Sequence, residues 1–315
     1  MNRTFPLYDL HWQEFEKLVI MICDKILGMG TMNFSKGSDG GRDAKFEGKA
    51  NKYPCAQTPW EGKFIIQAKH TEKPTAKCSD NDFKTILKQE VEKLKKLIEN
   101  NEVDYYLLFT NRSLSANINY KLENLLTNNV NIKSAIISNE RIQLWLQEYP
   151  DICKRLNLDN LLLPLQFYDN DIKAIVIAFS KIKENLSEEI GKQQVNLTHI
   201  ELTKKNEMNN LSKEYFDFIK SNSMLYFEQI KEFLGSPKNR QLKQDYDNTV
   251  SDLQEQIIIK REEYEKFEEL IAFIYKYILE RNFDELKNMR KLLRVFLHYM
   301  YFNCDIGKSE NVSTG

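Results

Sequence analysis

The sequence has little glycine, no closely spaced cysteine pair and no long hydrophobic run. Eleven glycines in 315 residues, together with a charged fraction of 29%, indicate a helix-rich protein. The five cysteines are scattered, and none of them forms a C-x-x-C pair. This pattern indicates neither a zinc ribbon nor a disulfide framework, and it is typical of a reducing cytosol.

The hydrophobic runs exclude a membrane-spanning protein, and the net charge limits how the chain could bind nucleic acid. The most apolar runs, such as Ile172–Phe179, are far shorter than the roughly 20 residues of a membrane span. The first residues also lack the apolar region of a signal peptide. We therefore expect a cytoplasmic protein with no membrane partner. A net charge of −1 gives no bulk signature of a nucleic-acid binder, so a DNA-binding surface must be a local patch or must arise by assembly.

The chain changes character near Pro164, which predicts three regions. Residues 1–165 form an α/β domain with a mixed sheet flanked by helices, residues 166–306 form an all-α domain, and residues 307–315 form a disordered tail. The elements expected in the first domain are helix His11–Leu27, strands Thr31–Phe34, Arg42–Phe46 and Lys63–Lys69, helix Phe83–Glu99, strand Val103–Thr110, helix Ala116–Leu126, strand Val130–Ile137 and helix Glu140–Leu146.

Local signals complete this picture of the first domain. Asp9 and Asp82 are expected to cap the two longest helices. The polar stretch Glu47–Glu61 reads as a surface excursion. Strands one and two form a hairpin around the glycine-rich turn Gly37–Gly41.

The sequence predicts helices throughout almost all of the second domain. Its expected helices are Asp171–Ile190, Gln194–Lys204, Asn209–Leu234, Leu242–Arg281 and Phe283–Asn303. Apolar residues recur at near-heptad intervals from Asp245 to Leu279 among dense charge. This spacing predicts one long helix in an antiparallel bundle or a coiled-coil arm.

The chemistry concentrates between Gly37 and Lys69. The turn delivers Asp43 onto the start of a strand, and the apolar strand Lys63–Lys69 ends in Gln67-Ala68-Lys69. Side chains alternate along a strand, so Gln67 and Lys69 share one side. Mg²⁺ prefers oxygen ligands, which Asp43 and Gln67 supply, with the Ala68 carbonyl as a further ligand. Lys69 can orient water or neutralise charge developing on a phosphate.

A second carboxylate comes from the first helix. Glu16 lies beside its apolar face and can point along the edge of the core, whereas Glu14 reads as a solvated surface acid. A purely structural interpretation also exists for this stretch. In that interpretation Asp43 caps a turn, Gln67 ends a strand and Lys69 is a surface charge.

Phe15-Glu16, then Gly-Ser-Asp-Gly-Gly-Arg-Asp, then Gln67-Ala68-Lys69 resemble the PD-(D/E)XK restriction-endonuclease superfamily, and more narrowly its Mrr-like branch. The resemblance covers about the first 150 residues. It implies a nuclease that uses Mg²⁺, or Mn²⁺ in its place, with Asp43 rather than Asp39 as the metal-binding aspartate. Double-stranded DNA would then be cut with low sequence specificity. Residues near the site that suit phosphate contacts are Lys36, Ser38, Arg42, His70 and Lys73.

The end of the chain carries a second resemblance. His298-Tyr299-Met300-Tyr301 and the following Cys304-Asp305-Ile306-Gly307 look like the C-terminal domains of effectors in ABC-three-component antiphage systems, the Lamassu type. This implies that the helical domain binds partner subunits, an SMC-like ATPase and an accessory subunit, or self-assembles into a homo-oligomer when active. The nuclease would be released or oligomerised when foreign DNA is sensed.

The sequence thus favours a metal-dependent DNA endonuclease that acts as a defence effector. One alternative is a non-catalytic nucleic-acid-binding or assembly subunit with a vestigial nuclease fold. Another is a free-standing Mrr-like restriction enzyme whose helical domain senses the DNA target.

Overall fold

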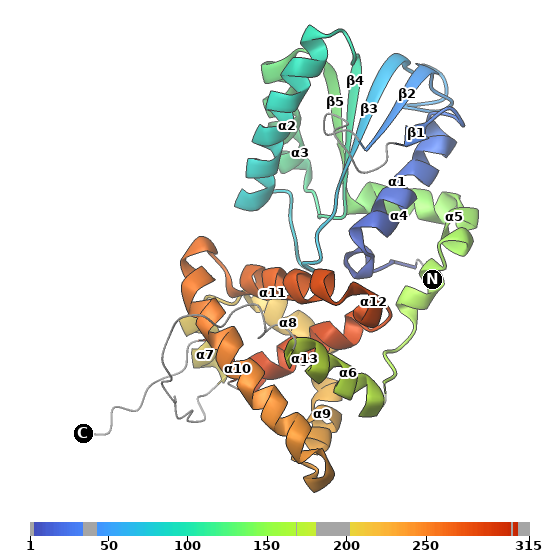
Figure 1. The fold of residues 1–315 in the computed structure, drawn as a ribbon. Coiled ribbons are helices and arrows are strands. Elements are labelled where there is room, and N and C mark those ends of the chain that lie inside the picture. The colour runs from blue at the N-terminus through green and yellow to red at the C-terminus, as the bar shows by residue number, and fades with distance from the viewer. Residues whose placement is uncertain (1–2, 34–42, 168, 181–201, 304, 308–315) are drawn as a thin grey trace. The chain divides into compact units, whose positions relative to one another are not determined.

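The computed structural model describes residues 3–33, 43–167, 169–180, 202–303 and 305–307. The chain divides into two compact units, Met1–Leu163 and Pro164–Gly315 (Figure 1). The first unit is α/β and the second is helical, as predicted. The division falls two residues before the expected end of the first domain at 165. Residues 308–315 of the expected tail lie outside the described residues. Nowhere in the described chain is a helix both long and apolar enough to cross a membrane.

The first unit has the predicted order of helices and strands up to its fourth helix. Its elements are α1 (Trp12–Ile26), β1 (Met32–Asn33), β2 (Ala44–Lys49), β3 (Glu61–Lys69), α2 (Asn81–Glu99), β4 (Tyr105–Thr110), α3 (Ala116–Val130), β5 (Lys133–Ile137), α4 (Asn139–Glu148) and α5 (Pro150–Arg155). Two short 3₁₀ helices, Leu7–Asp9 and Leu158–Leu162, flank this series.

The five strands lie in one mixed sheet in the order in which they occur along the chain. β1, β2 and β3 pair antiparallel, which confirms the predicted hairpin, and β3, β4 and β5 pair parallel. β3 is therefore the central strand, with a partner on each edge. Its apolar run Phe64–Ile66 is fully buried, because helices cover both faces of the sheet at this strand.

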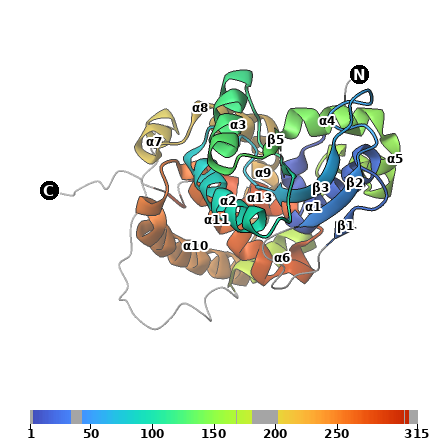
Figure 2. The ribbon, with the colours of Figure 1, turned by 90° about the horizontal axis from the view of Figure 1, so that it is seen from above.

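The two faces of the sheet have separate cores. Phe64 and Ile66 point into a core shared with α1, α4 and α5. Ile65 points the other way, into a core shared with α2 and α3. α2 and α3 lie side by side on that face (Figures 1 and 2). Alternation along the strand therefore sends Gln67 and Lys69 toward the side of the sheet that α2 covers.

One expectation about the sheet is wrong in part. The stretch Glu47–Glu61 is only partly an excursion, since β2 continues to Lys49 and β3 already begins at Glu61. Gly48 pairs with Gly62 across these extensions, and the alternating burial of β2 shows an ordinary strand with one exposed face. At Glu47–Lys49 the polar composition therefore reflected that exposed face, whereas residues 50–60 form the predicted excursion.

The starts of α1 and α2 also differ from the prediction. His11, not Asp9, is the N-cap of α1, and the Glu14 carboxylate accepts a hydrogen bond from the His11 N–H at 2.7 Å. Glu14 is thus part of a capping box rather than only a solvated acid. Asp80, not Asp82, occupies the N-cap position of α2, because that helix begins at Asn81.

The second unit is a bundle of helices. Its elements are α6 (Asp169–Ser180), α7 (Leu202–Asn209), α8 (Lys213–Asn222), α9 (Phe227–Gly235), α10 (Arg240–Lys260), α11 (Phe267–Arg281), α12 (Phe283–Leu286) and α13 (Arg290–Phe302), with 3₁₀ turns at Met224–Tyr226, Pro237–Asn239 and Arg261–Glu263. The expected helices Asp171–Ile190 and Gln194–Lys204 fall in part on residues 181–201, outside the described residues.

The long helix predicted from Leu242 to Arg281 is two helices. α10 ends at Lys260 and α11 begins at Phe267. In the break, Arg261 donates to the carbonyls of Tyr264 (2.5 Å) and Asn209 (2.9 Å). The bond to Asn209 is a tertiary contact, which the heptad-like spacing could not reveal. The expected helix Asn209–Leu234 is likewise divided, at Ser223 between α8 and α9.

His298 lies at the centre of the second unit. It is fully buried on α13, with its two ring nitrogens 2.9 Å from the Tyr215 hydroxyl and 2.7 Å from the Ser223 hydroxyl. Burial, reinforced by the nearby Arg294 charge, lowers the pKa of His298 to about 3. The imidazole is therefore neutral, and each of its nitrogens has a hydroxyl partner.

The residues after His298 tie further helices to α13. Tyr301 donates from its hydroxyl to Asn206 on α7 at 2.9 Å, and its carbonyl accepts from the buried Lys205 at 2.5 Å. Asp305 accepts a hydrogen bond from Tyr246 on α10. Gly307 has φ +88°, and an added Cβ there would lie 2.9 Å from the Asn209 amide oxygen. The His298–Gly307 motif is thus internal structure of this unit.

Candidate active site

Asp43 is fastened to the end of β3 by three hydrogen bonds. Its Oδ2 accepts from Gln67 Nε2 and from the Ala68 N–H, both at 2.6 Å. Its own N–H donates to the carbonyl of Ile66 at 3.3 Å. Residues far apart in the sequence therefore meet at one point, because β2 and β3 are antiparallel neighbours. The carboxylate of Asp43 and the amide of Gln67 are in direct contact there.

Gln67 is a buried polar side chain with an unsatisfied atom. Only 4% of the residue is exposed, and its Oε1 has no hydrogen-bond partner among the described residues. A buried acceptor without a partner costs about 1–3 kcal/mol. An amide oxygen beside a carboxylate is the ligand chemistry of a hard divalent cation such as Mg²⁺. The residues present therefore fit a cation, which would satisfy Gln67 Oε1.

The described residues contain no group of three or more His, Cys, Asp and Glu side chains that could hold a metal ion. The donor set at the end of β3 is instead one carboxylate, Asp43, and one neutral amide, Gln67. Such a set carries less negative charge than a pair of acids. A site of this kind binds a cation more weakly unless another oxygen, from the protein or a phosphate, joins it.

Lys69 lies two residues beyond Gln67, on the same side of β3. Its Nζ is 3.1 Å from Oε1 of Glu90, which projects from α2 and is 3% exposed. Tyr106 on β4 donates its hydroxyl to the other oxygen of Glu90 at 2.9 Å. Burial and the Glu90 charge raise the pKa of Tyr106 well above its ordinary value, so the phenol stays a donor.

The sequence pattern missed Glu90 and Tyr106. Phe83, Leu87 and Val91 recur at four-residue intervals and mark the buried side of α2. Glu90, which lies three residues after Leu87, is on the same side. An acid at such a position was the available signal. Its partner Tyr106 could be found only once β3 and β4 were known to be neighbours.

Glu16 is half-buried on α1. The buried side chains of α1, including Phe15 and Val19, belong to the core that contains Phe64 and Ile66. That core covers the side of the sheet opposite to Gln67 and Lys69. To join Asp43, the Glu16 carboxylate must therefore reach around the end of the strands, and its role as a ligand stays a prediction.

Two of the predicted phosphate contacts are buried. His70 Nε2 lies 2.9 Å from the Leu7 carbonyl, its ring packs against Phe15 at 5.2 Å, and its side chain is only 3% exposed. Lys73, with 6% of its side chain exposed, pairs with Asp80 at 3.3 Å. Such burial is unfavourable for binding DNA phosphates, and both roles stay predictions. Lys36, Ser38 and Arg42 lie outside the described residues.

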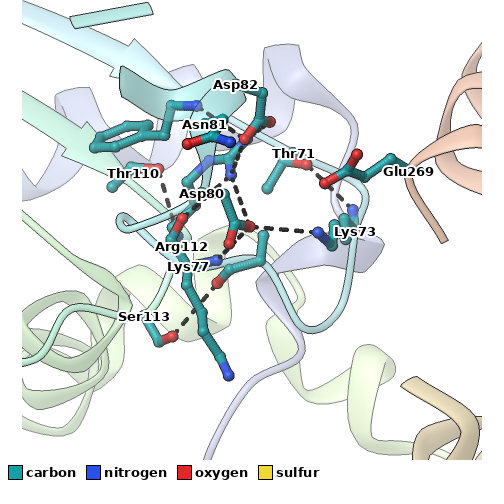
Figure 3. Close-up of polar contacts among 12 residues, drawn as sticks. Thr71, Lys73, Lys77, Asp80, Asn81, Asp82, Thr110, Arg112, Ser113 and Glu269 are labelled. Atoms are coloured by element: carbon teal, nitrogen blue, oxygen red, sulfur yellow. Dashed lines mark hydrogen bonds and ion pairs between the residues drawn. The ribbon is translucent and has the colours of Figure 1, made fainter. Parts of the chain in front are cut away.

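Arg112 holds the loop that follows Lys69 through hydrogen bonds and ion pairs. Its guanidinium donates to both carboxylate oxygens of Asp82, at 3.2 and 2.5 Å, and lies 3.5 Å from Asp80. Asp80 also accepts from the Lys77 N–H at 3.0 Å and pairs with Lys73 (Figure 3). Arg112 is 3% exposed and comes just after β4, so these contacts join the loop to two neighbouring elements.

Two family models match the chain. Residues 7–131 match the Mrr_cat family, described as restriction endonuclease. Residues 161–307 match C-terminal domain 12 of the ABC-three component (ABC-3C) systems. No curated protein matches the chain. The resemblances to Mrr-like restriction endonucleases and to the C-terminal domains of ABC-3C systems are thereby confirmed, whereas the narrower Lamassu type stays a prediction. The first match covers β1 to β4 and ends before β5, and the second covers α6 to α13.

Proposed function

We propose that this chain, which joins an Mrr-like restriction endonuclease domain to C-terminal domain 12 of the ABC-3C antiphage systems, is a metal-dependent DNA endonuclease and the effector of such a system. The observation that carries this proposal is the contact of Asp43 with Gln67 and Ala68 at the end of β3. Lys69 on the same strand adds a cation beside this oxygen-donor pair.

Each residue has a distinct role in this proposal. Asp43 and the Oε1 of Gln67 would hold Mg²⁺ or Mn²⁺, and the Ala68 carbonyl is a further candidate ligand. A bound divalent ion supplies Lewis-acid polarisation of the scissile phosphate. The positive charge of Lys69 would stabilise the negative charge that develops on the phosphate during cleavage. A second carboxylate, proposed as Glu16, would complete the set from α1.

Double-stranded DNA is the proposed substrate, cut with low sequence specificity. The support is the restriction endonuclease match together with the phosphate chemistry of the site. Arg42, Lys36 and Ser38 precede Asp43 in the sequence and remain proposed phosphate contacts. The near-zero net charge favours a substrate held by several copies or by partners rather than by one chain.

The helical domain is proposed to bind partner subunits and to control the nuclease. The ABC-3C match implies partner subunits. An SMC-like ATPase and an accessory subunit of the Lamassu type are the specific partners proposed, on the sequence resemblance alone. In the resting complex these partners would hold the nuclease inactive, and release or homo-oligomerisation would activate it.

One observation favours a second function, a non-catalytic nucleic-acid-binding or assembly subunit with a vestigial nuclease fold. Gln67 stands where an acid is commoner in this superfamily, so the described site holds a single carboxylate in contact with it. A protein of this kind would bind DNA and assemble with its partners without cutting.

Plasmid cleavage with Mg²⁺ tests the proposal. The parent is compared with Asp43→Ala and Lys69→Ala, each alone and together with the products of neighbouring genes. Lys133→Ala is the matched control, because this exposed lysine lies at the start of β5, at the opposite end of the parallel strands. We expect both site variants to cut about 100-fold more slowly or worse, with the control unchanged.

Two results would contradict the proposal. Undiminished cleavage by both site variants would mean that the site lies elsewhere. If neither the parent nor any assembly cuts DNA with either metal, the non-catalytic function is the correct one.

A further inference from the structure

Glu90 occupies a position where the fold requires no charge. It lies on the buried side of α2 next to Val91, and 3% of it is exposed. The surrounding core of Leu87, Leu94 and Leu108 is apolar. Removing a carboxylate from water costs several kcal/mol before any partner compensates it. An aliphatic residue of similar volume would satisfy the packing of α2 at least as well.

Three donors from three elements converge on the Glu90 carboxylate. Oε1 lies 3.1 Å from Nζ of Lys69 on β3 and 2.8 Å from Nζ of Lys93 on α2. Oε2 accepts from the Tyr106 hydroxyl on β4 at 2.9 Å. Tyr106 is itself buried, so its hydroxyl holds the carboxylate in place.

The two lysines differ in how far they depend on Glu90. The Lys69 side chain is 22% exposed and the Lys93 side chain 42% exposed. Lys93 is one turn from Glu90 on the same helix, and its exposed ammonium is screened by water, so this pair holds Lys93 only weakly. Lys69 comes from the strand end that bears Gln67, and a flexible four-carbon side chain there has many rotamers unless something holds it.

We infer that Glu90, held by Tyr106, is a positioning residue that fixes the Lys69 ammonium beside the Asp43–Gln67 pair. The inference rests on the proposed nuclease function, because it assigns Glu90 a task only through Lys69. Gln67 and Lys69 are two residues apart on one side of β3, about 7 Å between Cα atoms. A lysine fixed at that spacing reaches a phosphate held at Asp43, whereas a lysine free to rotate spends most of its time in solvent.

A double-mutant cycle in the full-length, cleavage-competent assembly tests the catalytic part of this inference. Glu90→Gln keeps the size and the acceptor for Tyr106 but removes the charge that holds Lys69. We expect its single-turnover cleavage rate to fall about tenfold or more, with DNA affinity in Ca²⁺ within about twofold of the parent. In a Lys69→Ala background, Glu90→Gln should have no further effect, since its only route to catalysis is gone.

Lys93→Ala is the matched control, because it removes the other cation from the same carboxylate. It should cleave at the parent rate. Three results would overturn the inference. Glu90→Gln could cleave at the parent rate, it could lower the cleavage rate by the same factor in the Lys69→Ala background as in the parent, or it could cleave faster than the parent. The last result would mean that the ion pair restrains Lys69.

A second measurement needs no nuclease activity, so a failure of the proposed function leaves the inference testable. Amine-specific labelling of Lys69 is followed by mass spectrometry in the parent, Glu90→Gln and Lys93→Ala. Loss of the ion pair should speed labelling of Lys69 severalfold in Glu90→Gln only. Equal labelling in all three proteins would show that Glu90 does not hold Lys69, whether or not the protein cuts DNA.

Discussion

Each unit contains a buried polar cluster, and the two clusters are built in opposite ways. His298 is neutral, and both of its ring nitrogens have a neutral hydroxyl partner. At the end of β3 a carboxylate and an ammonium group lie near a neutral amide, Gln67, whose Oε1 has no partner among the described residues. A buried polar network that is fully satisfied rigidifies a core, whereas an unsatisfied buried oxygen such as Gln67 Oε1 lacks the partner that a water or an ion could supply.

This contrast separates two motifs that look equally distinctive in the sequence. The His298–Gly307 motif resembles a family signature, yet Tyr301 and Asp305 form hydrogen bonds to other helices of the same bundle. The Gln67-Ala68-Lys69 motif holds a ligand pair together at a strand end. Substitutions in the two clusters should therefore have different consequences, with stability affected in one and ligand binding in the other.

Replacing His298 with Ala should give the largest change in stability. The hydroxyls of Tyr215 and Ser223 would lose their partner in a buried site, and a cavity would remain. We expect the free energy of unfolding to fall by about 3–4 kcal/mol, measured by urea denaturation. Hydrogen exchange should show lost protection in α8 and α13, with β3 unaffected. The control is Lys276→Ala, a substitution of an exposed lysine. If His298→Ala lowers the free energy of unfolding no more than this control does, His298 does not have this role.

Acidic pH should lower the free energy of unfolding through the same histidine, His298. The folded protein takes up a proton at His298 only near pH 3, whereas the unfolded chain does so near 6.5. The unfolded state therefore binds more protons between these values, and the free energy of unfolding falls as pH drops from 6.5 toward 3. The slope is about 1.4 kcal/mol per pH unit, or about 2 kcal/mol at pH 5. His298→Gln removes this contribution, so the stability gap between parent and variant should narrow by that amount at pH 5. A constant gap would contradict the prediction.

How much of this could be predicted from the sequence depends on the range of the interactions involved. Local alternation along β3 was enough to place Gln67 and Lys69 on one side of the strand. The order of helices and strands in the first unit followed from apolar periodicity. Glu90 was missed because an acid among the lysines of α2 resembles a solvated face. The break at the end of α10 was missed because the Arg261 guanidinium there donates to the carbonyl of Asn209, which is remote in the sequence.

Replacing Gln67 with Glu tests the site cluster directly and should give the smallest change in stability. The new carboxylate would face the Asp43 oxygen that now accepts from Gln67 Nε2 at 2.6 Å. Two carboxylates in contact repel unless a cation lies between them. In EDTA we therefore expect the free energy of unfolding to fall by about 1 kcal/mol, measured by thermal or urea denaturation.

Mg²⁺ should reverse this loss, because a ligand that binds only the folded state stabilises it in proportion to RT ln(1 + [Mg²⁺]/Kd). The second carboxylate lowers Kd, so the melting temperature of Gln67→Glu should rise with Mg²⁺ more steeply than that of the parent. Gln89→Glu, which adds the same charge on the exposed face of α2, should show no such dependence. If Gln67→Glu is as stable as the parent in EDTA and does not respond to Mg²⁺, then Asp43 and residue 67 do not share a cation, and the unsatisfied Gln67 oxygen needs another explanation.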